Sequence, residues 1–188
     1  ILSQRFREDL SSFLSTCRVT RGLQRVRLGA VGARPNAFNT TRFSEQLLEA
    51  SGISVNTIDL SEIFAQANKI ANNDARVILR IEQIRAYADS SQAPIESLQK
   101  MARFAIVVDD WMQQLGITAT AVQCWSSMQQ NLGVNVCNIM SMMSENMLPS
   151  ACEVDVAGVV SMYMLQLASA RPSVLVCWNN NYGDGRDL

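Results

Sequence analysis

Short apolar runs alternate with longer segments of helical periodicity along nearly the whole chain, and this alternation limits the possible folds more than any other feature. Five runs are predicted as strands: 26–31, 53–60, 117–125, 134–140 and 173–178. The segments between them place apolar residues three and four positions apart, as one buried face of a helix requires. Strands alternating with helices indicate an α/β fold: a doubly wound, Rossmann-like parallel sheet with helices on both faces. The length of 188 residues fits a single domain.

Capping residues predict where several helices begin and end. An amphipathic first helix, expected to cover the body of the protein, carries Phe6, Leu10, Phe13, Leu14 and Cys17. Further helices are expected from Thr40 or Thr41 to a stop at Gly52, from Ser61 to about Ala71, from Asp74 to about Ala88, from Ile95 to Gly116, and from about Cys152 to Ala168. A short helical turn is expected at 126–133.

The charge balance excludes several classes of partner. The chain has 16 basic and 17 acidic residues without a block of one sign. Nucleic-acid contact is therefore not expected, and neither is attraction to an anionic membrane. No apolar run is long enough to span a bilayer, so membrane insertion is not expected. Other protein subunits are the expected partners, in a homo- or hetero-oligomer.

Histidine is absent and the cysteines follow no known motif. Five cysteines lie in apolar segments without CxxC spacing, which is typical of free thiols in a reducing intracellular compartment, the cytoplasm or an organelle matrix. The lack of histidine excludes a Ser-His-Asp triad, a Cys-His pair and any histidine-ligated metal built from this chain alone.

Polar residues converge in the last part of the chain. A carboxylate, Glu153, precedes a helical crossover, and the apolar run after the crossover leads into a polar loop at 179–182. Both loops are expected at the edge of the sheet where open α/β folds bind ligands. Residue types suited to a sugar pocket are Gln123, Trp125, Phe38, Asn179, Asn180, Asn181 and Tyr182, because amides bind hydroxyls and rings cover C–H faces. Alternatively, Trp125 belongs to the core and the asparagines only satisfy their own turns.

A second loop, with Gly29 and Gly32 near the end of the first predicted strand, allows two interpretations. It is either a plain tight turn or a loop whose backbone N–H groups face an anion. Its spacing matches neither GxGxxG nor a Walker loop.

The sequence also resembles a known family. The segment ACEVDVAGVVSMYMLQLASARPSVLVCWNNNYGDG, at 151–185, looks like the metal-site segment of the L-fucose isomerase family, the sugar isomerases related to L-arabinose isomerases. The resemblance extends to the segments 5–64, 108–134 and 140–150. It implies that residues 1–188 correspond to the central α/β domain of the family, without the domains that flank it there.

The resemblance implies an aldose–ketose isomerase that uses a divalent metal, usually manganese, held by a Glu, an Asp and a distant His. The Glu falls on Glu153, as metal ligand and acid–base group, and the Asp falls on Cys177. No residue of this chain matches the His. A thiol in place of a carboxylate offers soft sulfur where manganese prefers hard oxygen. Manganese is therefore the implied cofactor, and we expect none to be bound by this chain alone.

Two hypotheses follow. In the first, the chain is a portion of a metal-dependent sugar isomerase, such as one for L-fucose or D-arabinose, and another part of the protein or another subunit supplies the missing ligands. In the second, it is a non-catalytic structural or interaction subunit derived from that family, because loss of an acid–base position is expected once catalysis is no longer selected.

Overall fold

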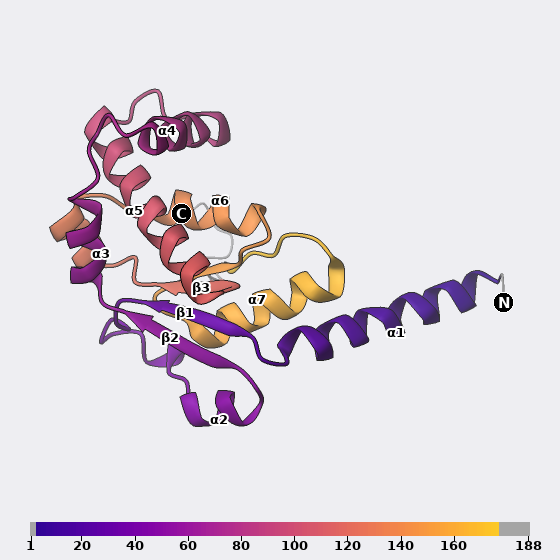
Figure 1. Cartoon of the computed structure of the whole chain (residues 1–188). Coiled ribbons are helices and arrows are strands. Elements are labelled where there is room, and N and C mark those ends of the chain that lie inside the picture. Colours follow the sequence, from indigo (N-terminus) through magenta and orange to yellow (C-terminus); the bar gives the residue numbers. More distant parts are fainter. Residues whose placement is uncertain (1–2, 177–188) are drawn as a thin grey trace, which may run out of the picture.

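Four parallel strands form one sheet at the centre of the molecule. The structure is a computed structural model that describes residues 3–176. The strands are β1 (Arg27–Val31), β2 (Ser54–Ile58), β3 (Ala119–Val122) and β4 (Ser150–Cys152). Their order is β2-β1-β3-β4, and each neighbouring pair is parallel (Figure 1). The order reverses between β2 and β3 around β1, as in a doubly wound sheet. The predicted fold class is confirmed.

Helices cover both faces of this sheet. They are α1 (Gln4–Leu23), α2 (Glu45–Ala50), α3 (Leu60–Ala67), α4 (Ala75–Tyr87), α5 (Ile95–Leu115), α6 (Cys137–Glu145) and α7 (Val156–Ser169). A 3-10 turn lies at Asn39–Thr41 and a π-helical turn at Met128–Leu132. None of the described helices is long and apolar enough to cross a lipid bilayer.

Alternating side chains of the strands build a separate core on each face. Val31 and Val122 point to the face that packs against α3, α4, α5 and α6. Leu28, Ala30 and Ala121 point to the opposite face, where α7 packs through Val159 and Met162. The two-residue period of a strand produces this division. Gly29 lies on the first face, and a Cβ there would be 2.7 Å from the Trp111 ring, so glycine allows this close approach.

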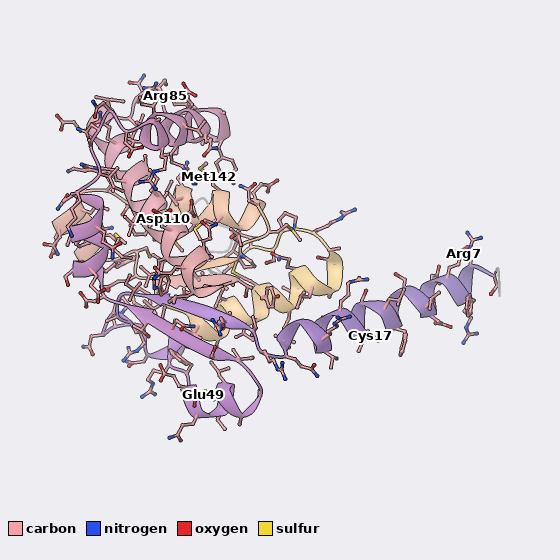
Figure 2. All side chains as sticks on the ribbon, viewed as in Figure 1. Arg7, Cys17, Glu49, Arg85, Asp110 and Met142 are labelled. Atoms are coloured by element: carbon pink, nitrogen blue, oxygen red, sulfur yellow. The ribbon has the colours of Figure 1, made fainter. Side chains whose placement is uncertain are left out.

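Helix α1 forms as predicted but does not cover the body. None of its residues is buried, and Phe13 is 64% exposed. Figure 1 shows α1 extending away from the sheet, and in Figure 2 its side chains, Arg7 among them, project into solvent. Contact with the body is confined to its C-terminal part, where Arg18 bonds to the carbonyl oxygens of Leu167 and Ala168 on α7. The expectation of a covering helix is therefore wrong.

The fourth predicted strand, 134–140, is also wrong. Helix α6 begins at Cys137 and buries Ile139, Met140 and Met143, which recur at helical spacing. The valines at 134 and 136 suggested alternation, but the periodicity of the following residues determines the structure. The fourth strand is instead Ser150–Cys152, which is too short and too polar to stand out in the sequence.

The apolar run 173–178 was predicted as a fifth strand, and its described part, 173–176, is not one. Val174 and Val176 are 72% and 71% exposed, and the Ser173 hydroxyl donates to the Met162 carbonyl on α7 at 2.8 Å. Among the described residues the sheet ends at β4. A strand needs a partner strand for its backbone groups, and no strand of the described residues pairs with 173–176.

Most predicted helix ends agree with the structure. Asp74 caps α4, and Gly116 ends α5 in the left-handed conformation. Gly52, with φ of +84°, follows the end of α2. The start of α2 was misplaced, because Ser44 rather than Thr40 or Thr41 provides the N-cap. The Thr41 hydroxyl donates to the Phe38 carbonyl instead.

Candidate functional site

The loops after β1 and β3 meet at the carboxyl edge of the sheet. The Gln123 side-chain oxygen accepts a hydrogen bond from the Ala33 N–H at 2.8 Å. The backbone N–H of Gln123 in turn donates to the Val31 carbonyl at 2.8 Å. Gly32 has φ of +84°, and a Cβ there would lie 2.5 Å from the Gln123 amide oxygen. Glycine at this position therefore serves a tight turn, the first of the two interpretations of this loop.

Two aromatic residues lie beside this turn. The Phe38 and Trp125 rings pack edge to face with centroids 5.5 Å apart. Trp125 is 52% exposed, so it does not belong to the core. The structure thus brings together three of the residues predicted for a sugar pocket, Gln123, Trp125 and Phe38, and their contact with sugar stays a prediction. Asn179, Asn180, Asn181, Tyr182 and Cys177 lie outside the described residues.

Glu153 lies in a strained turn between β4 and α7. It has φ of +62°, and Val154 has φ of +54°. A β-branched residue rarely adopts this conformation, and such strain is often found at functional sites. Asp155, not Glu153, caps α7: its carboxylate accepts from the Gly158 N–H at 2.7 Å. The prediction that the helix starts near Cys152 is therefore wrong by about one turn.

The environment of Glu153 does not favour its charged form. A helix N-terminus usually stabilises the charge of a nearby carboxylate. Partial burial instead raises the pKa of Glu153, and the charge of Asp155 raises it further. The helix N-terminus interacts with Asp155, so Glu153 does not gain that stabilisation.

Thiols surround this carboxylate. The sulfurs of Cys124 and Cys152 and a carboxylate oxygen of Glu153 all lie within 4.8 Å of one another. Cys152 is the last residue of β4, and its register partner on β3 is Val122, two residues before Cys124. Cys124 and Cys152 are 28 positions apart without motif spacing, so the sequence alone did not predict this cluster. The four cysteines in the described part of the chain are all free.

Contacts among the thiols separate their acidities. The neighbouring thiols of Cys137 and Cys152, together with burial, raise the pKa of Cys124, while the backbone N–H of Glu153 acts in the opposite direction. The interaction with Cys124 lowers the pKa of Cys137 to about 6 and also lowers that of Cys152.

A cavity of about 410 Å³ opens beside these thiols. Cys137, Cys152 and Ser150 line it together with Glu145 from α6 and Leu175. Solvent and small ligands therefore have access to two of the three clustered sulfurs.

The donors at this site do not fit manganese. Manganese and magnesium prefer about six oxygen ligands from carboxylates, carbonyls and water. In the described part of the chain, the donor cluster offers one carboxylate and two thiols. Glu153 alone cannot provide a hard octahedral site, so no chemical step through manganese follows from these residues.

Comparison with known proteins indicates a class for this domain. No protein-family model matches the chain. Significant similarity to curated proteins covers 82 to 87% of the chain, and all of these relatives are sugar isomerases by name. The chain is therefore an α/β fold similar over most of its length to part of these sugar isomerases.

The particular relatives are sulfoquinovose isomerases. That of Clostridium sp. (strain MSTE9) is 26% identical over 156 residues, 82% of this chain and 35% of the relative. That of Alkalicoccus urumqiensis is 25% identical over 164 residues, 87% of this chain and 37% of the relative. That of Priestia megaterium is 26% identical over 160 residues, with shares of 85% and 35%. The chain thus spans little more than a third of the length of these relatives.

Proposed function

We propose that this chain is a domain of an aldose–ketose isomerase related to the L-fucose isomerase family, and that it does not isomerise sugar by itself. The similarity to sulfoquinovose isomerases supports the first part. The observation that carries the second part is the donor cluster at Glu153, in which the other two donors are thiols, while the nearby Asp155 carboxylate caps α7.

The chemistry explains why these neighbours matter. Isomerisation moves a proton between adjacent carbons through an ene-diol, which requires an acid–base pair and an electrophile for the developing oxyanion. Manganese held by carboxylates would polarise the sugar oxygens. Glu153 supplies one acid–base group, and Cys177 stands where the resemblance places the other. The rest of the machinery is proposed to come from another part of the protein or another subunit.

In this proposal the sugar binds at the carboxyl edge of the sheet. Gln123, Trp125 and the segment Asn179–Tyr182 contact it, with Trp125 covering a C–H face. The substrate of the complete protein is an aldose such as sulfoquinovose, by analogy with the named relatives, or L-fucose, by the family resemblance. Free thiols suit the reducing intracellular compartment that we propose for it.

The test is an isomerisation assay on the purified chain with manganese and L-fucose, D-arabinose or sulfoquinovose, in which NMR detects ketose. We expect no ketose above the metal-free control. In a separate NMR experiment on sugar binding, we expect saturation transfer from protein to sugar, which should decrease in Trp125→Ala but not in Phe13→Ala. Isomerase activity of the chain that Glu153→Gln abolishes would contradict the proposal that the chain does not isomerise sugar by itself. Absence of saturation transfer from the intact chain would remove the sugar contact.

One observation favours the second candidate, a non-catalytic interaction subunit. Helix α1 exposes large apolar side chains: Phe6, Leu10, Phe13 and Leu14. An exposed apolar surface of this kind is typical of a protein–protein contact. Recovery of activity in Cys177→Asp alone would contradict this candidate, because it would show that the domain retains the rest of a catalytic site.

A further inference from the structure

The three clustered donors have the spacing of a tetrahedral metal site. Zinc binds sulfur at about 2.3 Å and carboxylate oxygen at about 2.0–2.2 Å, so two sulfurs on one tetrahedral ion lie roughly 3.8 Å apart. The donor atoms of Cys124, Cys152 and Glu153 already lie within 4.8 Å of one another. Small movements of the side chains would bring these donor atoms to ligation distance.

The backbone holds these donors in place. The pairing of Val122 with Cys152 fixes the ends of β3 and β4 relative to each other. The Val154 N–H donates to the Val122 carbonyl at 3.2 Å, and the Asp155 N–H donates to the Cys152 carbonyl at 3.0 Å. These bonds hold the left-handed turn that contains Glu153. Donors on rigid, hydrogen-bonded elements form a more precise site than donors on a free loop.

Cys137 offers a fourth donor from outside this trio, because its sulfur is not among the donor atoms that all lie within 4.8 Å of one another. It is the first residue of α6 and lines the cavity of about 410 Å³ together with Cys152, and its side chain would have to move toward the ion. The cavity gives an ion a route from solvent. Cys17 lies far away on α1 (Figure 2), with an exposed side chain, and is not part of the cluster.

We propose that Cys124, Cys152 and Glu153, completed by Cys137, bind a zinc ion. Three sulfurs and one carboxylate oxygen would give zinc four ligands of types that it binds in proteins. Thiolates select zinc over manganese and magnesium, which favour oxygen. The ion would join β3, β4 and α6 and stabilise this edge of the sheet.

The zinc site and the sugar contact can be tested separately, although a zinc ion bound by Glu153 would occupy the carboxylate that the proposed function uses as an acid–base group. Zinc binding without any sugar contact would leave the zinc site in place and remove the sugar site. Sugar contact without zinc binding would support the sugar site and remove the zinc site.

The test uses the whole chain, reduced and free of metal, titrated with Co²⁺ as a spectroscopic probe and then with Zn²⁺. We expect a thiolate-to-cobalt charge-transfer band with tetrahedral d–d bands, displacement of cobalt by zinc, and one zinc per chain in native mass spectrometry. Cys124→Ser and Cys152→Ser are expected to weaken zinc binding at least about 100-fold, and Glu153→Gln and Cys137→Ser about tenfold or more. Loss of an outer-shell partner already weakens metal binding about 10- to 100-fold, and loss of a direct ligand should weaken it at least as much. Cys17→Ser is the matched control and should bind as the unmodified chain does.

A second measurement avoids variants that fail to fold. In the unmodified chain, zinc should slow alkylation of Cys124, Cys137 and Cys152, as read by peptide mass spectrometry, and leave alkylation of Cys17 unchanged. Any one of three results would overturn the zinc site: absence of the charge-transfer band, equal zinc affinity in Cys124→Ser and Cys17→Ser, or unaltered alkylation of Cys124, Cys137 and Cys152 on addition of zinc.

Discussion

Helices α1 and α5 have almost the same length, 20 and 21 residues, and both place apolar side chains at helical spacing. Their surroundings are opposite. Helix α5 buries eight residues between the sheet and the helices beside it, while α1 buries none and extends into solvent. The comparison shows that an apolar stripe in the sequence predicts an amphipathic helix. The stripe does not indicate whether another part of the same domain packs against the apolar face of that helix.

The largest expected difference concerns side chains on these two stripes. Phe104 on α5 is 1% exposed, and Phe13 on α1 is 64% exposed. Phe104→Ala removes a fully buried ring and should lower the free energy of unfolding by about 3–5 kcal/mol. Phe13→Ala should change it by less than about 0.5 kcal/mol, because an exposed side chain loses little burial. Urea unfolding followed by circular dichroism measures both.

The same two variants also distinguish the roles of the helices. If α1 binds another subunit, Phe13→Ala should weaken self-association or partner binding in sedimentation velocity without a change in stability. Equal destabilisation by the two substitutions would mean that α1 packs on its own domain, and the contrast between the helices would disappear.

A smaller difference is expected at the C-terminal ends of the two helices. Helix α5 ends at Gly116 with φ of +65° and open space around the Cβ position, so Gly116→Ala should cost about 1 kcal/mol through backbone strain alone. Helix α1 ends at Gln24 with φ of −70°, and Gln24→Ala is the matched control, expected to be nearly neutral. Thermal unfolding of both variants provides the comparison. A neutral Gly116→Ala would show that α5 does not depend on this cap.

The smallest expected effect concerns the attachment of α1. The Arg18 guanidinium donates to the carbonyls of Leu167 and Ala168, each at 3.0 Å, at the C-terminal end of α7. Arg18→Ala should reduce global stability by no more than about 1 kcal/mol, since these bonds are solvent-exposed. It should, however, accelerate amide hydrogen exchange in the last turns of α1 and α7. Arg7→Ala, on the projecting part of α1, should leave that exchange unchanged, and equal acceleration by both would exclude Arg18 as the anchor.

Local signals predicted the fold where they were strong. The caps at Asp74 and Gly116 are confirmed because a helix end depends on the few residues around it. Prediction failed where local signals were ambiguous: Val134 and Val136 suggested a strand before α6, and the true strand Ser150–Cys152 carries no apolar alternation. Such a short strand forms because β3 supplies hydrogen-bond partners, which no window of sequence reveals.

The candidate site divides in the same way. Glu153 was identified from the sequence through the family resemblance, and Gln123, Trp125 and Phe38 from their chemistry and expected position at the sheet edge. The thiols near Glu153 were not. Cys124 follows β3, Cys137 begins α6 and Cys152 ends β4, and only the parallel pairing of β3 with β4 brings the sulfurs of Cys124 and Cys152 together with the Glu153 carboxylate.

The sequence by itself determined the alternation of strands and helices as far as β3, the α/β class and the absence of any histidine, because these depend on composition and on periodicities within a few residues. Only the tertiary structure decided which apolar stripe is buried and that the Glu153 carboxylate lies among sulfurs. Burial and ligand geometry depend on contacts between residues far apart in the chain, and those contacts exist only after the strands have paired.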